Sequence, residues 1–301
     1  MSQPAEPAEA SRIADAFLEA CLAELRALKP GNVHIFAEGH GMTLAQFEAS
    51  ARAAAPVIAA PGLRVGRRIL KAVEATRSAV GLNTNLGIVL LAAPLIAAAW
   101  RPERGNLRTR VAAVLDALDR ADAEAAYAAI RLAAPGGLGR SPVEDVADPP
   151  TCGLKQAMGL AADRDRIARQ YVTAFCDVFE VGVPRLSEAL AEGIAPDEAV
   201  ATVHLRFMAA FADSHIQRKF GAATAEAVRG EAELLDREWL WRGPWVERRR
   251  RLLAFDTKLK SRGLNPGTSA DLTVACLLAS RLDDMIALPP HSGPERARGQ
   301  G

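Results

Sequence analysis

The sequence of 301 residues predicts an all-α protein, and its composition and periodicity both support that class. Alanine and leucine, which favour helices, are abundant, whereas aromatic residues make up only 5% and β-branched runs are few. Apolar residues recur at spacings of three and four, as on one face of a helix, at Ile13, Phe17, Cys21, Leu25 and Leu28. No alternating pattern typical of a strand stands out.

Helices are expected in succession along the whole chain, each bounded by a turn or a capping signal. Thr43 and Gln46 have the spacing of a capping box that opens the second helix. Pro196 suits the first turn of a later helix that runs to Phe211. The other predicted helices cover residues 62–79, 84–100, 106–119, 122–133, 151–160, 163–181, 222–241, 245–261 and 268–286. The Gly- and Pro-rich segment 134–150 is predicted to be the longest loop.

These elements predict a single-domain multi-helix bundle over residues 10–288, with functional loops between its helices. Residues 1–9 and 289–301 are rich in proline, glycine and charge, so we expect flexible ends there.

Charge and cysteine content exclude several classes of protein. Lys and Arg number 37 and Asp and Glu 36, a net charge of +1, which argues against nucleic-acid binding by charge alone. The most apolar run, residues 86–100, is shorter than the roughly 20 residues of a membrane span and contains Pro94. The four cysteines are scattered and no signal peptide is evident. We therefore expect a cytoplasmic protein that acts on small molecules and binds neither nucleic acid nor a membrane. The sequence leaves open whether it forms a homo-oligomer.

Four polar, glycine-containing segments interrupt the helical pattern: residues 29–34, 81–87, 207–219 and 264–271. Each one could be an ordinary helix boundary; Thr268, for example, is a good N-cap with Asp271 in the first turn after it. The alternative interpretation is a ligand site, because Lys, Arg and helix N-termini bind phosphate and a carboxylate can move a proton.

The order of these segments resembles the triphosphoribosyl-dephospho-CoA synthase family, which makes the prosthetic-group precursor of citrate lyase and malonate decarboxylase. The resemblance rests on the KPG of Lys29–Gly31, the NT..G of Asn83–Gly87, the segment Asp213–Gly221 and the NPG.SAD of Asn265–Asp271. It spans roughly residues 10–288, and the family is all-helical, in agreement with the prediction from composition.

The chain departs from the citrate-linked members, which read KPGLVD and NTHKG. It has KPGNVH, with His34 in place of an acid, and NTNLG, with Asn85 and Leu86 in place of a cationic pair. It therefore resembles a divergent branch found beside one-carbon genes of the methanopterin type. Two alternatives stay open: a related nucleotide-dependent transferase for a pterin or furan cofactor, and a non-catalytic helical protein that binds nucleotides.

The resemblance implies a glycosyl transfer, in which the 2′-hydroxyl of dephospho-CoA attacks the ribose of ATP and adenine leaves. ATP is then a substrate, Mg²⁺ is expected with it, and the transition state is like an oxocarbenium ion. Asp213 or Asp271 is expected to be the general base or a Mg²⁺ ligand, with His34 taking over part of the role of the missing acid. The expected nucleotide and phosphate ligands are Lys29, Gly31, Asn32, Asn83, Thr84, Asn85, Gly87, His215, Arg218, Lys219, Asn265, Gly267, Thr268 and Ser269.

A weaker candidate for Mg²⁺ is the acidic cluster that includes Asp145, Asp163 and Asp165, although solvated surface charge is the commoner explanation of such a run. If the four segments form one site, they must lie around a common cavity although residues 29 and 271 are far apart in the chain.

Overall fold

The computed structural model describes residues 5–37, 42–103, 105–137, 139–141, 143–239 and 244–287. Within these ranges the chain is a helical bundle without β-strands, which confirms the predicted class; His34 and Ala37 form only an isolated bridge. None of the described helices is long and apolar enough to span a membrane. Residues 289–301, expected to be a flexible tail, lie outside the described part.

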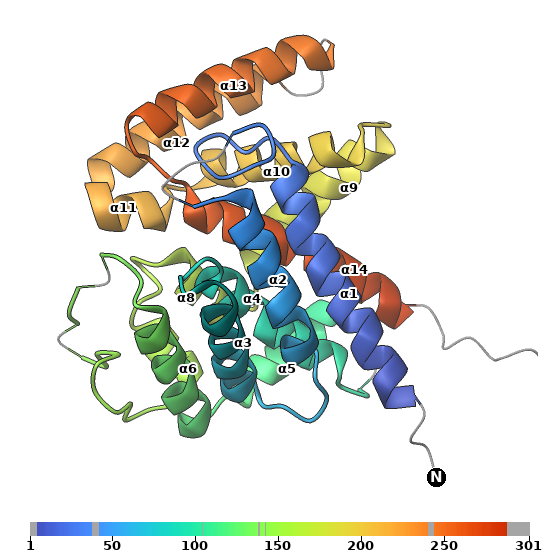
Figure 1. Cartoon of the computed structure of the whole chain (residues 1–301), viewed down its shortest axis with the longest axis vertical. Coiled ribbons are helices and arrows are strands. Elements are labelled where there is room, and N and C mark those ends of the chain that lie inside the picture. The colour runs from blue at the N-terminus through green and yellow to red at the C-terminus, as the bar shows by residue number, and fades with distance from the viewer. Residues whose placement is uncertain are drawn as a thin grey trace, which may run out of the picture.

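The first half of the chain builds one side of the bundle (Figure 1). Its helices are α1 (Ala5–Arg26), α2 (Leu44–Ile58), α3 (Val65–Val80), α4 (Leu86–Ala99), α5 (Leu107–Asp116), α6 (Arg120–Ala133), α7 (Leu154–Gly159) and α8 (Arg166–Val172). Helix α2 packs on α3, and α3 packs on α6. The predicted capping box of Thr43 and Gln46 is present at the start of α2.

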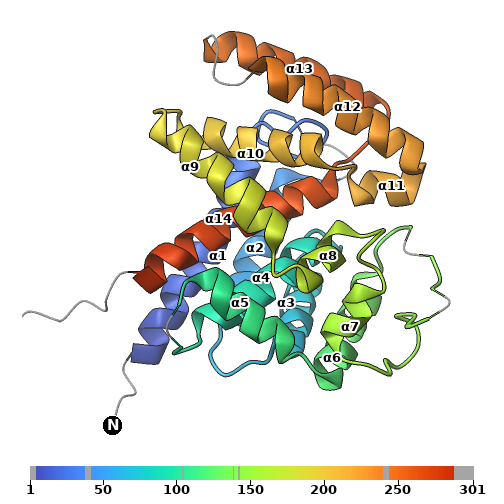
Figure 2. The same ribbon diagram turned by 180° about the vertical axis from the view of Figure 1, so that it is seen from behind.

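The second half adds a π-helix (Asp177–Gly182), α9 (Val183–Ala191), α10 (Pro196–Ala210), α11 (Ser214–Phe220), α12 (Ala222–Trp239), α13 (Trp245–Ser261) and α14 (Gly267–Ala287). Helices α9 to α13 lie together on the other side of the bundle, as both ribbon views show (Figures 1 and 2). Between the two sides run α1 and α14, and α14 packs on both α1 and α4.

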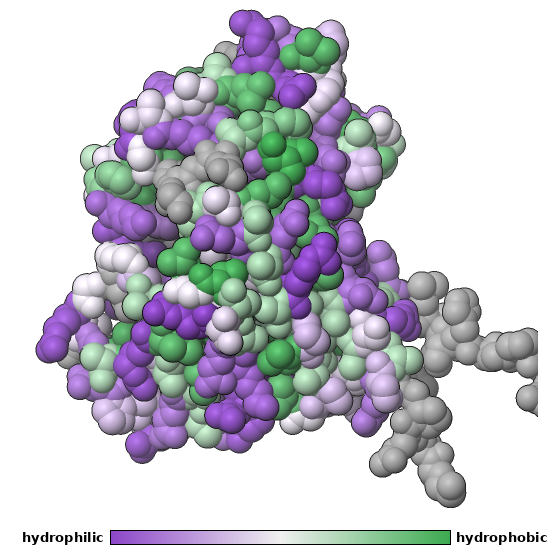
Figure 3. Space-filling view, in the orientation of Figure 1, coloured by the Kyte–Doolittle hydropathy of each residue, from purple (hydrophilic) through white to green (hydrophobic). Residues whose placement is uncertain are grey.

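Helix α4 forms the centre of the core. Nearly all its residues are apolar, and Leu86 and the whole run from Ile88 to Ile96 are buried. Pro94 is accommodated inside this helix. Burial on all sides explains why the segment shows no polar face although it does not enter a membrane. On the outer surface, hydrophilic residues are mixed with scattered apolar ones (Figure 3).

Most helix ends lie within about three residues of the sequence prediction, and two larger differences stand out. Helix α1 begins at Ala5, so helix reaches into the segment expected to be flexible. The single helix predicted over residues 163–181 is divided into α8 and the π-helix, because Ala174 and Phe175 adopt positive φ angles of 48° and 59°. Arg166 joins the two pieces through a two-pronged ion pair with Asp177.

Candidate functional site

All four polar segments contribute side chains to one cavity of about 300 Å³, which confirms that they converge in space. The cavity lies where α1, α4, α11 and α14 approach one another. Its lining includes Asn32 from the first segment, Asn83, Thr84 and Gly87 from the second, His215, Arg218 and Lys219 from the third, and Asn265, Gly267, Thr268 and Asp271 from the fourth.

The N-termini of two long helices face this cavity. Leu86, Gly87 and Ile88 come from the first turn of α4, and Gly267 and Thr268 start α14. The first N–H groups of a helix have no partner within the helix and carry the positive end of its dipole. The cavity is therefore suited to an anionic ligand such as a phosphate chain.

Asp271 is the carboxyl group that the protein leaves free in this cavity. Neither of its oxygens has a hydrogen-bond partner among the residues that the structure describes. Burial and the nearby charges of Glu24, Asp213 and Asp165 raise the pKa of Asp271 well above its usual value. A half-buried carboxyl group without protein partners in a ligand-sized cavity is a candidate for proton transfer.

Gly87 makes room for Asp271. A Cβ atom on Gly87 would lie only 2.0 Å from Oδ2 of Asp271 and 2.8 Å from Cδ1 of Ile167. The glycine of the NT..G segment thus lets the carboxyl group sit directly against the N-terminus of α4.

Asp213 has a structural task instead. Its Oδ1 accepts hydrogen bonds from the backbone N–H groups of His215 and Ile216, at 2.9 and 3.2 Å, and so caps α11. Its Oδ2 accepts from both the N–H and the hydroxyl group of Ser269, each at 2.8 Å. With four donors on two oxygens, Asp213 fastens α11 to the start of α14 and has no capacity left for a substrate proton or a metal ion.

The cations of the third segment lie at the edge of the cavity, in the last turn of the short helix α11. Arg218 donates to the carbonyl oxygen of Gly136 and pairs with Asp165 at 3.4 Å. Lys219 is exposed beside the same loop. The ring of His215 rests on Gly267, where a Cβ atom would come within 2.3 Å of its Nδ1.

Lys29 does not reach the cavity. Its side chain is fully buried and its ammonium group pairs with Glu24 and donates to Oδ1 of Asn32 at 3.1 Å. Its expected role as a direct phosphate ligand therefore does not fit its position. Asn32 does line the cavity, and its amide group donates to Oδ1 of Asn265 at 2.9 Å, which connects the first segment to the fourth.

Gly31 brings the first and fourth segments into close contact. Its φ angle is +80°, a conformation that glycine adopts readily, and a Cβ atom there would lie 2.7 Å from Cδ of Pro266. Its role is thus to shape the loop, and it is not part of the cavity lining.

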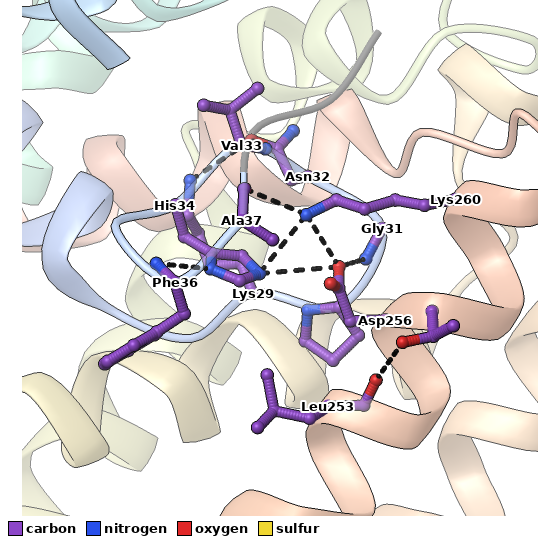
Figure 4. Close-up of polar contacts among 12 residues, drawn as sticks. Lys29, Gly31, Asn32, Val33, His34, Phe36, Ala37, Leu253, Asp256 and Lys260 are labelled. Atoms are coloured by element: carbon purple, nitrogen blue, oxygen red, sulfur yellow. Dashed lines mark hydrogen bonds and ion pairs between the residues drawn. The ribbon is translucent and has the colours of Figure 1, made fainter. Parts of the chain in front are cut away.

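The side chain of His34 points toward Asp256 and Lys260 of α13 (Figure 4), and His34 does not line the cavity. Its Nδ1 accepts from the N–H of Phe36 at 3.2 Å, so Nε2 carries the proton and lies 3.4 Å from Asp256. Burial lowers the pKa of His34, and Asp256 also accepts from the N–H of Gly31 at 2.8 Å. Replacement of the usual acid by His34 thus serves to hold the loop on α13, and the expected catalytic role is not supported.

Most of the remaining predicted ligands hold the cavity walls together. Thr84 donates to the hydroxyl group of Ser50 at 2.6 Å, and Asn83 accepts from the N–H of Leu86 at 3.2 Å. Asn85 is buried and donates to Thr76, so it lies behind the wall. Thr268 shares a hydrogen bond of 2.9 Å with Ser214, and Ser269 is fully buried against Asp213.

Glu24 belongs to the cavity lining but was not among the residues expected from the sequence. It follows Phe17 and Cys21 at spacings of seven and three and precedes Leu28 by four, so it lies on the apolar face of α1. An acid on an otherwise apolar helical face was the signal that could have identified it.

The model of the ATP:dephospho-CoA triphosphoribosyl transferase family matches residues 10–289. The chain belongs to this family. It is therefore a transferase, and ATP is the substrate that the family shares.

A solved structure agrees with the family assignment. It is a candidate triphosphoribosyl-dephospho-CoA synthase from Archaeoglobus fulgidus, 26% identical in sequence, with a TM-score of 0.58. The match covers 79% of this chain and 97% of that one. No curated protein matches the chain.

Most of the carboxylates expected to hold Mg²⁺ are engaged within the protein or lie on its surface. Among the residues that the structure describes, no group of three or more His, Cys, Asp or Glu side chains could hold an ion. Asp145 accepts from the N–H groups of Ser141 and Ala147, Asp165 caps α8, and Asp163 is exposed. Asp213 is engaged in the same way, so Asp271 is the expected Mg²⁺ ligand that lines the cavity without a protein partner.

Proposed function

We propose that this cavity is the active site, in which the triphosphoribosyl group of ATP is transferred to the 2′-hydroxyl of dephospho-CoA and adenine is released. The observation that carries the proposal is Asp271, a carboxyl group without protein partners in a cavity that two helix N-termini face and that Arg218 and Lys219 border on one edge. Binding of a polyphosphate and movement of a proton are the two tasks that this transfer requires.

The phosphate chain would be held chiefly by the positive ends of α4 and α14 together with Arg218 and Lys219. The amide groups of Asn32, Asn83 and Asn265 are suited to ribose hydroxyls or phosphate oxygens. Mg²⁺ would arrive bound to ATP, as part of the substrate, because it commonly keeps water and phosphate ligands and needs few from the protein.

Asp271 would act on the leaving group. Because its pKa is raised, it keeps its proton at a pH where an ordinary aspartate has lost it, so donation to the departing adenine suits it better than the general-base role expected from the sequence. The transition state carries positive charge on the ribose, and the polar walls of the cavity can stabilise that charge.

The test is release of free adenine from ATP by the purified protein, followed by chromatography, with dephospho-CoA and with pterin- or furan-containing acceptors. We expect adenine and a triphosphoribosylated product in equal amounts with dephospho-CoA. Release only with a pterin or furan acceptor would support the one-carbon alternative. Calorimetric binding of ATP without any release would support a non-catalytic nucleotide-binding protein.

The compartment belongs to the same proposal. All four cysteines are free thiols, two of them buried, which suits the reducing conditions of the cytoplasm. We therefore place the reaction there, where ATP is supplied.

A further inference from the structure

A second carboxyl group, that of Glu24 near the end of α1, faces the same cavity as Asp271. The residue is only 4% exposed, and its Oε1 is paired with the ammonium group of Lys29. Both carboxyl groups line this one cavity, and after burial the charge of Glu24 is the next largest cause of the raised pKa of Asp271. The cavity is thus a two-carboxyl site.

A continuous chain of polar contacts fixes the position of Glu24. The ammonium group of Lys29 pairs with Oε1 of Glu24 and donates to Asn32, which in turn donates to Asn265 just before α14. Asp271 lies in the first turns of that same helix. This series of contacts therefore fixes where Glu24 on α1 lies relative to Asp271 on α14.

The two carboxyl groups experience different surroundings. Burial raises the pKa of Glu24 above its usual value, and the adjacent ammonium group of Lys29 offsets part of that rise because it stabilises the carboxylate form. No ammonium or guanidinium group forms a salt bridge with Asp271 among the described residues, and burial together with the charge of Glu24 favours its protonated form. When the surroundings of two carboxyl groups favour different protonation states, one group can act as the acid and the other as the base.

We propose that Glu24 is the second catalytic residue: it accepts the proton of the attacking hydroxyl group while Asp271 donates a proton to the departing adenine. Lys29 is then a positioning residue that holds Glu24 ionised and aimed into the cavity. This inference rests on the proposed function, because both roles refer to the same glycosyl transfer.

The step balances in atoms and charge. The C–N bond between ribose and adenine breaks, its electron pair leaves with adenine, and the proton of Asp271 joins adenine. A C–O bond to the acceptor forms, and the hydroxyl proton moves to Glu24. The enzyme is left with Glu24 protonated and Asp271 ionised, and passage of this proton from Glu24 to Asp271 within the shared cavity restores the starting state.

The decisive experiment removes the charged pair as a unit. In Glu24→Gln/Lys29→Met both side chains stay similar in size and no unpaired charge remains buried, so the protein is expected to fold. We expect kcat for adenine release to fall by about 10²–10⁴, as for loss of an acid–base group. Near-normal kcat in a folded double variant would overturn the proposal.

The control is the buried pair of Arg185 and Asp236, 3.2 Å apart and outside the cavity lining, in which Asp236 also pairs with the half-buried Arg206 at 3.0 Å. Arg185→Met/Asp236→Asn also removes a buried ion pair, and we expect it to keep wild-type kcat. Equal losses in both double variants would mean that the effect of residues 24 and 29 is only structural.

Lys29→Met alone supplies a readout that a structural role would not change. Without the ammonium group the pKa of Glu24 rises, so the acidic limb of the kcat/KM profile should move to higher pH. An unshifted limb would refute the positioning role. Absence of adenine release from the wild-type protein would overturn the proposed function itself, whereas an active wild type with an equally active double variant would overturn only the role of Glu24.

Discussion

At the scale of single residues, two aspartates of the site show how surroundings decide a role. Asp213 receives four hydrogen bonds from three residues, whereas Asp271, to which the structure assigns none among its described residues, faces open space. The raised pKa of both reflects burial, so charge alone does not separate them. Their hydrogen-bond partners separate the two roles. The same substitution should therefore lower activity at Asp271 and stability at Asp213.

Asp271→Asn is predicted to lower the rate of adenine release by about 10²–10⁴ with little change in melting temperature. The substitution keeps the shape of the side chain and removes a proton donor that no protein group depends on. Turnover and thermal melting measured on one preparation check it. A near-normal rate would mean that Asp271 is only a helix-start residue.

Asp213→Asn is predicted to destabilise the fold by about 3 kcal/mol, measured by urea unfolding. One end of the asparagine can still cap α11, but its NH₂ group would face the N–H and hydroxyl groups of Ser269, which now donate to Oδ2. Unchanged stability would contradict the role of Asp213 as the clip between α11 and α14.

At the scale of elements, the site depends on how closely the first turn of α4 approaches α14. The sequence allowed the helices and the convergence of four segments to be predicted, because glycines and polar residues mark helix ends. It did not reveal which polar residues turn inward: Lys29 and His34 have the residue types of ligands, but tertiary contacts with Glu24 and Asp256 hold them elsewhere. Such contacts join residues up to 222 positions apart and leave no local pattern.

Gly87→Ala tests the close approach of the two helices. Alanine favours a helix over glycine by about 1 kcal/mol, so α4 should persist, but its Cβ would displace the carboxyl group of Asp271. We expect kcat to fall at least about tenfold in a folded protein, since small misplacement of a reacting group has large effects on rate.

Gly230→Ala in α12 is the control for that substitution, because a Cβ atom at Gly230 meets nothing within 4 Å. It should stabilise the protein by about 0.5–1 kcal/mol and leave kcat unchanged. Equal activity of the two alanine variants would show that the space at Gly87 is not needed for catalysis.

At the scale of the whole molecule, the bundle encloses polar groups that link its stability to pH. His204 on α10 is fully buried, and its Nε2 lies 3.4 Å from the carbonyl oxygen of Pro30. Burial, with the charge of Lys29, lowers the pKa of His204 to about 3. The neutral imidazole thus belongs to the contact between α10 and the loop that follows α1.

Acidification should therefore destabilise the protein through His204. In the unfolded chain a histidine binds a proton near pH 6.5, whereas the folded protein binds it only near pH 3. Between these values the unfolded state holds more protons, so stability is lost as the pH falls, by about 2 kcal/mol between pH 7 and pH 5.

His204→Gln keeps a donor for Pro30 and removes the titration. Urea unfolding at pH 7, 6 and 5 should show that the variant loses about 2 kcal/mol less unfolding free energy than the wild type between pH 7 and pH 5. The buried carboxyl groups titrate alike in both proteins, so their contribution cancels in the comparison. Equal losses in variant and wild type would mean that folding does not lower the pKa of His204.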